Sequence, residues 1–290
     1  MSDNFLFSDA ANAYLHAVRA DYEREASWKR IAVSLRAMSG FLGGLRLVEL
    51  TTSDIEDFKQ ERLQSLKPVS VRHDLISLGL FLRHARRQDW IRTDLLDGVK
   101  IPSDKDAVHI RVVELDEERR YLAAALSDGK LYLLVKLMLA TGMRPGEVRM
   151  LRVADFELHG RTIAIRKGQS RAARRTLKLV GDVFDLMEAK ARGRAASEFL
   201  IPGRSDGNPF APMNNAHNDA CVRAGLVNAA GRREIRIYDF RHTFATRMAG
   251  RGMPLTTLAA ILGHSNLRCV MCYVHPSQAA MDDALLKFAG

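Results

Sequence analysis

Cysteine is scarce in this chain, which has only Cys221, Cys269 and Cys272. Three thiols cannot form the paired disulfide framework that holds many small secreted proteins together. No hydrophobic run is long enough to span a bilayer. The first ten residues, MSDNFLFSDA, have neither the basic start nor the apolar stretch of a secretory signal. We therefore expect a cytoplasmic protein with no membrane partner.

Acidic residues are too few to balance the basic ones. The chain has 34 Asp and Glu against 44 Lys and Arg, which gives a net charge of +10. This charge suits a phosphate-rich partner, because each neutralised phosphate releases condensed counterions. Two common signatures are also missing, since there is no Gly-rich loop ending in Gly-Lys-Ser/Thr and no Gly-x-Ser-x-Gly. Their absence argues against a P-loop nucleotidase and an α/β-hydrolase.

The length and the apolar content are sufficient for two domains. The chain has 290 residues, of which 47% are hydrophobic. Residues 8 to about 95 carry apolar stripes at helical spacing, and Ser8 is expected to cap the first helix. Residues 97–112 have no sustained periodicity. We expect a helical domain over residues 1–96, a linker over 97–112 and a second domain over 113–290.

The second domain is expected to combine helices with a small sheet. A buried helix over Leu131–Ala140 should stop at Gly142. Thr162–Lys167 and Thr176–Leu179 alternate apolar and polar residues, and the polar run between them predicts a β-hairpin. The chain after Gly181 has helical patterning again. The fold class is therefore mainly α with a small β-sheet.

One helix of the first domain is strongly basic. Asp74 is the only acid between Val71 and Gln88. The arginines of this helix that we predict to contact DNA are Arg72, Arg83, Arg86 and Arg87. An ordinary solvated face is the alternative.

Three local motifs of the second domain place polar side chains at helix ends. TGMRPGEV forms a glycine turn that delivers Arg144, with Pro145 in the first helical turn and Glu147 able to hold the turn or the guanidinium. In YDFRHTFA, Asp239 is expected to cap a helix that carries Arg241 close to its positive end. In the third motif, LGHS, Gly263 should close one helix and Ser265 should cap the next. His264 then lies at the junction, and Tyr273 follows. Each motif alone is also compatible with ordinary capping and packing.

Taken together, these motifs resemble the signature of the tyrosine recombinase (phage integrase) family. That signature consists of an Arg, a Lys in a hairpin, a His-x-x-Arg, a Leu-Gly-His and a Tyr. The matching residues, in the same order and at similar separations, are Arg144, Lys167, Arg241, His264 and Tyr273. The resemblance implies a helical, SAM-like core-binding domain followed by an α+β catalytic domain.

The resemblance also implies the reaction. Tyr273 would attack a DNA phosphodiester and form a 3′-phosphotyrosine, while Arg144, Arg241 and His264 stabilise the transition-state charge. A tyrosine hydroxyl has a pKa near 10, so this attack needs a cationic surround or a base. Lys167 would protonate the leaving 5′-oxygen. The bond energy is kept in the adduct, so we expect no cofactor and no metal.

The expected partners follow from the same resemblance. They are double-stranded DNA with inverted-repeat core sites, three further copies of the chain in a homotetramer, and an accessory directionality factor. Strands would be exchanged through a Holliday junction. We also expect the tail after Tyr273 to dock on a neighbouring protomer, with packing on its own domain as the alternative.

One position departs from the family pattern. The usual His of His-x-x-Arg is Tyr238, whose phenol can donate a hydrogen bond but cannot act as a base near pH 7. We keep Tyr238 as a site residue. The alternative is that the neighbouring His242 takes this role, but helical geometry argues against it, because His242 should point about 100° away from Arg241. His275 is expected to be structural.

Three other readings of these residues are open. Cys269 and Cys272, with His264 and His275 nearby, would suit zinc, but no second cysteine pair exists. A type IB topoisomerase-like enzyme would use similar residues, although the helical first domain favours a recombinase. An integrase relative that only binds DNA should have lost a catalytic group, yet Tyr238 alone deviates.

Overall fold

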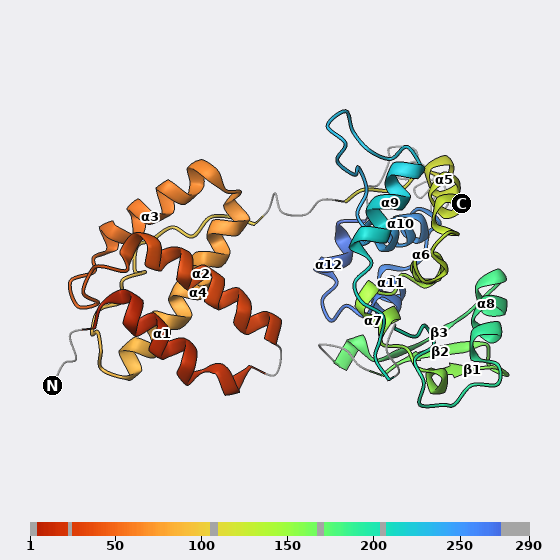
Figure 1. Ribbon diagram of the computed structural model, residues 1–290, viewed down its shortest axis with the longest axis horizontal. Coiled ribbons are helices and arrows are strands. Elements are labelled where there is room, and N and C mark those ends of the chain that lie inside the picture. The colour runs from red at the N-terminus through yellow and green to blue at the C-terminus, as the bar shows by residue number, and fades with distance from the viewer. Residues whose placement is uncertain (1–4, 23–24, 105–109, 167–170, 204–206, 274–290) are drawn as a thin grey trace, which may run out of the picture. The chain divides into compact units, whose positions relative to one another are not determined.

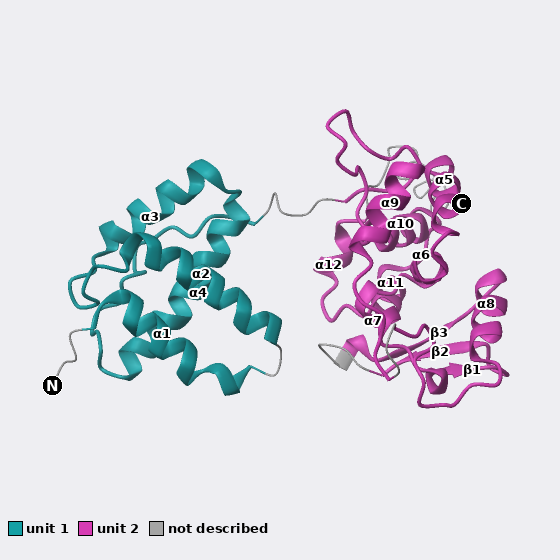
Figure 2. Ribbon diagram, in the orientation of Figure 1, with its two compact units in different colours: residues 1–109 teal, residues 110–290 magenta. Residues whose placement is uncertain are grey.

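The computed structural model describes residues 5–22, 25–104, 110–166, 171–203 and 207–273. The chain divides into two compact units, residues 1–109 and 110–290 (Figure 1, Figure 2). The division falls inside the segment that we predicted to be the linker. Each unit encloses a hydrophobic core of its own.

Within its described residues, the first unit is a bundle of four α-helices. They are α1 (Phe7–Ala17), α2 (Glu25–Leu42), α3 (Thr52–Ser65) and α4 (Pro68–Arg87), and the 3-10 turn η1 (Arg19–Asp21) follows α1. Helix α4 contacts each of the other three. Its Phe81 is fully buried and packs edge-on against Phe7, with ring centroids 5.4 Å apart.

Two of the helices in this unit begin with residues that are typical of helix starts. Thr51 forms a capping box with Asp54 at α3, and Pro68 is the first residue of α4. The prediction that Ser8 caps α1 is wrong. The helix begins at Phe7, and the Ser8 hydroxyl donates a hydrogen bond to the Gly43 carbonyl (3.1 Å).

The lone acid of the basic helix joins three helices. Asp74 of α4 is 6% exposed and accepts hydrogen bonds from the Ser34 hydroxyl of α2 (2.7 Å) and the Arg62 guanidinium of α3 (2.9 and 3.2 Å). A buried carboxylate is tolerated only when it is paired in this way. Asp74 is therefore part of the core, and the basic side of α4 lies elsewhere on the helix.

Within its described residues, the second unit surrounds a small sheet with helices. The helices are α5 (Leu115–Ala125), α6 (Gly129–Thr141), α7 (Pro145–Arg149), α8 (Asp182–Ala191), α9 (Asn214–Arg223), α10 (Asp239–Gly250), α11 (Leu255–Leu262) and α12 (Arg268–Met271). The strands are β1 (Phe156–Glu157), β2 (Thr162–Ile165) and β3 (Arg175–Lys178), with the 3-10 turns η3 (Val153–Asp155) and η4 (Arg171–Ala173).

The predicted strand pair is confirmed. β2 and β3 are antiparallel, and buried Ile163 lies opposite buried Leu177. β1 adds a third strand that the sequence analysis did not find, because two residues are too few to show alternation. The fold class, mainly α with a small sheet, is confirmed as well.

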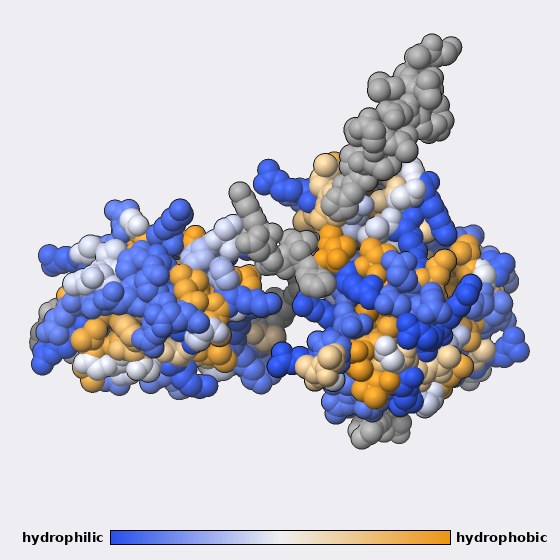
Figure 3. All heavy atoms as spheres, turned by 90° about the horizontal axis from the view of Figure 1, so that it is seen from above, coloured by the Kyte–Doolittle hydropathy of each residue, from blue (hydrophilic) through white to orange (hydrophobic). Residues whose placement is uncertain are grey.

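Three helices bring the candidate motifs together. α10 packs against both α6 and α11, and Arg241, near the start of α10, donates to the carbonyls of Gly142 and Leu262 at the C-terminal ends of α6 and α11. In the space-filling view, hydrophilic residues cover most of the visible face of each unit, and apolar residues form small separate patches (Figure 3).

Candidate active site

A glycine turn at the end of α6 places the first arginine. Gly142 has φ +68°, and a Cβ there would lie 2.5 Å from Cδ1 of Phe244 and 2.7 Å from Cδ2 of Leu262. Only glycine fits both the backbone and the space. Arg144 is the N-cap of α7, and Pro145 is its first residue, as predicted.

Glu147 holds Arg144 twice. Its carboxylate accepts the backbone N–H of Arg144 (2.8 Å) and the guanidinium Nη1 of the same residue (2.9 Å). Burial would raise the pKa of Glu147, but hydrogen bonds from Arg175 and from the Arg144 amide bring the pKa below its usual value. Glu147 is therefore an ionised carboxylate that holds Arg144 in place.

Arg241 is fully buried and is bonded to backbone carbonyls. Nη1 donates to Gly142 (2.7 Å) and Nη2 donates to Leu262 (2.8 Å). Burial lowers the pKa of this guanidinium to about 10, so it is still charged at neutral pH. Arg144 Nη1 also donates to the Leu262 carbonyl (3.3 Å). One backbone oxygen thus brings both cations together.

His264 lies against Arg241. Gly263 ends α11 in the left-handed conformation, as predicted, and His264 Nε2 is 2.6 Å from Arg241 Nη2. Burial, followed by Arg241, Arg144 and Arg175, lowers the pKa of His264 to about 4. The imidazole is therefore neutral at pH 7, with Nε2 as acceptor and the proton on Nδ1. Nδ1 is buried without a hydrogen-bond partner in the described part of the chain.

Tyr273 follows the short helix α12. The prediction that Ser265 caps this helix is wrong, because Asn266 Oδ1 accepts the N–H of Arg268 (2.8 Å) and Leu267 occupies the N-cap. Tyr273 is 5% exposed. Burial raises the pKa of its hydroxyl, and Arg241 offsets this increase only in part. The hydroxyl is therefore protonated at neutral pH, and attack requires a proton acceptor.

His242 supplies a candidate acceptor, and the inference that it takes no part in the site is wrong. Its Nδ1 lies 2.9 Å from the Tyr273 hydroxyl oxygen. Residues 238 and 242 are one turn apart, so His242 shares the face of Tyr238 while Arg241 faces inward. The His242 ring lies 5.1 Å from that of Tyr238 and 5.6 Å from that of Tyr273.

Tyr238 therefore stands at the edge of this cluster. It is 38% exposed, and its ring lies 5.9 Å from the Arg241 guanidinium carbon. Tyr238 is also the N-cap of α10, so the prediction of Asp239 as the cap is wrong by one residue. Asp239 is buried and accepts the N–H of Arg236 (2.7 Å).

A further arginine, which the sequence analysis missed, touches the cluster. Arg175 begins β3 and forms a two-pronged ion pair with Glu147 (2.9 and 3.1 Å). Lys167, His275 and the tail after Tyr273 lie outside the described residues. Their assigned roles stay predictions.

The predicted DNA-contacting arginines lie on α4, in the first unit. Arg72 donates to the Pro102 carbonyl (3.1 Å) and pairs with Asp104, while Arg86 pairs with Asp94 (2.7 Å). Arg83 and Arg87 are exposed, and neither forms an ion pair with a described residue. These two are therefore the more available for phosphate.

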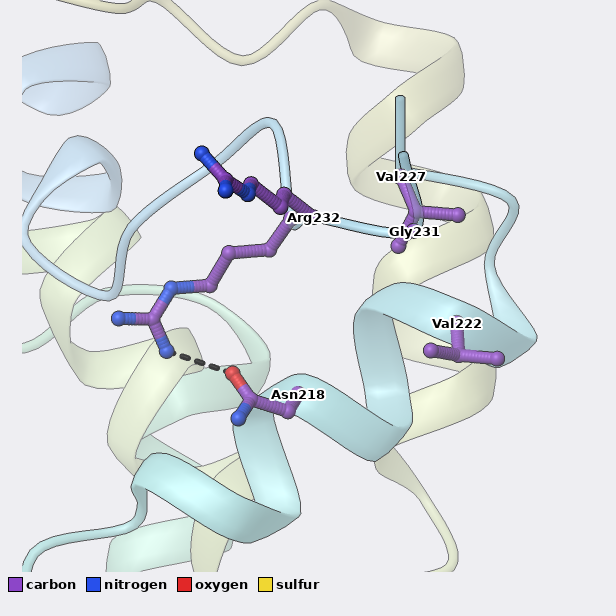
Figure 4. Close-up of a pocket in the computed structure, with 6 residues that line it drawn as sticks. Asn218, Val222, Val227, Gly231 and Arg232 are labelled. Carbon is purple, nitrogen blue, oxygen red and sulfur yellow. Dashed lines mark hydrogen bonds between the residues drawn. The ribbon is translucent and has the colours of Figure 1, made fainter. Parts of the chain in front are cut away.

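Other features of the second unit lie apart from this cluster. An open hollow of about 380 Å³ is lined by Asn218 and Val222 of α9 and by the loop that carries Val227, Gly231 and Arg232 (Figure 4). None of the candidate site residues that the structure describes lines it. Among the described residues, no three His, Cys, Asp or Glu side chains cluster as metal ligands, and none of the helices is both long and apolar enough to cross a bilayer.

Comparison with known proteins places the chain in a family. Residues 111–280, more than half of the chain, match the model of the phage integrase family. The chain belongs to the phage integrase family. The matched region contains the cluster of Arg144, Arg241, His264 and Tyr273, so the family resemblance inferred from the sequence is confirmed.

Relatives of this phage integrase family member cover both units. It is 25% identical over 262 residues to the tyrosine recombinase XerD of Rhizobium meliloti, across 83% of this chain and 81% of the relative. The Tn1549 transposon integrase in complex with circular intermediate DNA has a similar fold, with a TM-score of 0.76 at 17% identity, covering 98% of this chain and 99% of that one. A λ integrase tetramer bound to a Holliday junction gives a TM-score of 0.73 at 15% identity, covering 90% and 78%.

Proposed function

We propose that this phage integrase family member is a site-specific recombinase that cuts and rejoins DNA through a 3′-phosphotyrosine at Tyr273. The observation that carries the proposal is the convergence of two guanidiniums and an imidazole, together with Tyr273, whose hydroxyl pKa is raised by burial, an increase that the charges of Arg241 and Arg144 partly offset. Arg144 and Arg241 share the Leu262 carbonyl, and Arg241 contacts His264. This is a ready anion site of fixed geometry, as the transition state of phosphoryl transfer requires.

Each group has a task in the reaction. The Tyr273 oxygen forms a bond to phosphorus as the bond from phosphorus to the 5′-oxygen breaks. The proton of Tyr273 passes to His242 Nδ1, which lies 2.9 Å away. Arg144 and Arg241 meet the charge on the non-bridging oxygens, and the Nδ1–H of neutral His264 donates a hydrogen bond to one of them. The leaving oxygen takes its proton from Lys167, on the family resemblance.

The partners follow from this chemistry. A free 5′-hydroxyl of a second duplex reverses the reaction and joins the strands, so a complete exchange needs four active sites and passes through a Holliday junction. We propose that four copies of the chain assemble on inverted-repeat core sites in the cytoplasm. Arg83 and Arg87 would contact DNA phosphates, and an accessory factor would control the direction of recombination. A solved tetramer of similar fold, that of λ integrase on a junction, supports this assembly.

A trapping experiment tests the proposal. The DNA site that the protein binds is first selected from a library of duplexes of random sequence. That site is rebuilt as a nicked duplex, so that cleavage releases a short strand and the adduct persists. Wild type should give a covalent protein–DNA band in denaturing electrophoresis, and Tyr273→Phe should give none. A band with both proteins would refute Tyr273 as nucleophile. Relaxation of an arbitrary supercoiled plasmid would indicate a topoisomerase instead.

A further inference from the structure

Arg175 is buried at the first position of β3, where its guanidinium lies against the candidate active site. Its side chain is 7% exposed, as is that of Glu147. Nη1 and Nη2 donate to the two carboxylate oxygens of Glu147, at 3.1 and 2.9 Å. This two-pronged geometry is specific to arginine, because a lysine ammonium cannot reproduce the planar fork.

Through Glu147, this contact fixes Arg144. Glu147 Oε1 accepts from Nη1 of both arginines, and Oε2 accepts the Arg144 amide together with Arg175 Nη2. Both oxygens of one carboxylate are thus shared between the two residues. With Arg175 in place, rotation of the carboxylate breaks hydrogen bonds on both sides, so the position of the Arg144 guanidinium is fixed.

Arg175 also supports the turn that carries His264. Its Nε donates to the carbonyl of Ile261, in the last turn of α11. A Cβ on Gly263 would lie 2.7 Å from Arg175 Nη1 and 3.1 Å from the Cα of Ala173. The backbone of the turn therefore lies directly on Arg175. The same turn provides the Leu262 carbonyl that receives Arg144 and Arg241.

We propose that Arg175 is a positioning residue for DNA cleavage, which holds Arg144 through Glu147 and the Leu262–His264 turn through direct contact. This role rests on the proposed recombinase function. Arg175 itself touches no reacting atom in this arrangement. It sets the separation of the groups that do, and displacements of about 1 Å in such groups can reduce rates by about 100-fold.

The first test separates chemistry from binding. Arg175→Lys keeps the charge but loses the fork, so single-turnover cleavage of the nicked duplex should fall about 100-fold, with DNA affinity within about threefold of wild type. Arg247→Lys is the matched control, because Arg247 also joins a carboxylate, Glu118, and a backbone carbonyl, Val113, but away from the cluster. The control should cleave at the wild-type rate. Equal rates for the two variants would overturn the proposal.

A second readout distinguishes positioning from a general loss of structure. A methylphosphonate at the scissile position carries one negative charge fewer, so less depends on well-placed cations. The deficit of Arg175→Lys should shrink at least about tenfold on this duplex. A deficit of the same size on both duplexes would mean that Arg175 only maintains the fold. Such a result would refute the positioning role.

Failure of the role proposed for Arg175 must be distinguished from misfolding of the variant and from failure of the proposed function. If Arg175→Lys does not fold, the measurements are made on Arg175→Gln, which keeps a planar N–H donor but loses the charge and the two-pronged contact with Glu147. A wild-type cleavage rate there would overturn the proposal. A wild-type chain that forms no adduct would refute the proposed function, and this role with it. Normal adduct formation by wild type and by the variants would refute the role of Arg175 alone.

Discussion

Nδ1 of His242 lies 2.9 Å from the hydroxyl oxygen of Tyr273, although the two residues are separated by thirty-one positions in the chain. Because burial raises the pKa of this hydroxyl, an adjacent proton acceptor is what makes attack feasible at neutral pH. The histidine next to Arg241 thus takes the position of the proton acceptor, which Tyr238 cannot fill because its phenol is not a base near pH 7.

His242 should therefore matter more than Tyr238. We expect His242→Ala to slow single-turnover cleavage by about 100-fold, the usual contribution of a general base. Tyr238→Phe removes only an exposed hydroxyl and should stay within about threefold of wild type. Rates are measured on the nicked duplex at saturating protein. A larger loss with Tyr238→Phe than with His242→Ala would reverse the assignment.

The glycine turn before Arg144 should be intolerant of a methyl group. Gly142→Ala combines a positive φ with a 2.5 Å contact to Phe244, so we expect a loss of roughly 2 to 4 kcal/mol in the free energy of unfolding. Gly146→Ala is the matched control, since it lies in α7 with nothing within 4 Å. The control should be neutral or slightly stabilising. Urea titration compares the two, and similar losses would contradict the steric account.

Stability should decline between pH 6.5 and pH 4. Burial lowers the pKa of His217 to about 4, and its ring is held neutral between the Tyr121 hydroxyl (2.7 Å) and the Ile235 carbonyl (3.1 Å). The unfolded chain binds a proton in this range and the folded one does not, so stability is full above pH 6.5 and falls as the pH drops. At pH 5 the expected loss from His217 is about 2 kcal/mol.

A variant identifies this contribution. His217→Gln should lower stability at pH 7.5 but reduce the further loss between pH 7.5 and pH 5, as followed by urea titration at each pH. His264, whose pKa is also lowered to about 4, should leave part of the slope in place. An unchanged slope in His217→Gln would show that His217 is not the group that titrates.

The basic helix α4 should contribute to DNA binding unevenly. Arg83 and Arg87 have no described carboxylate partner, whereas Arg86 is paired with Asp94. We expect Arg83→Ala and Arg87→Ala each to reduce the slope of log affinity against log salt by about 1. Arg86→Ala should change it less. Fluorescence anisotropy over a salt series measures the slopes, and three equal changes would contradict this ranking.

Much of the fold and of the site could be predicted from local sequence. Gly142 and Gly263 end helices, Pro145 begins one, and alternation marks β2 and β3, because each of these signals depends on a few neighbouring residues. Where tertiary contacts decide, the sequence analysis failed. The hydroxyl of Ser8 donates to the carbonyl of Gly43, far along the chain. The carboxylate of Asp239 accepts the backbone N–H of Arg236.

Arg175 and His242 were missed for the same reason, because each contacts residues that are distant in the chain. Arg175 is one of two adjacent arginines in the sequence, and its partners Glu147 and Ile261 come from opposite sides of it in the chain. His242 was excluded by its angle to Arg241, yet the site extends over two faces of α10. No local sequence pattern shows where Tyr273 lies in the fold. The contacts of Arg175 with Glu147 and of His242 with Tyr273 therefore could not be predicted from the sequence.

The Leu262 carbonyl, which accepts from both Arg144 and Arg241, has a consequence for how this site can be studied and how it can evolve. Every amino acid supplies the same oxygen there, so a mutational scan of position 262 would report on the packing of the buried side chain and not on the carbonyl. The oxygen that accepts from both guanidiniums belongs to the main chain. Only a backbone edit, such as an ester in place of the amide between residues 262 and 263, would weaken that acceptor directly.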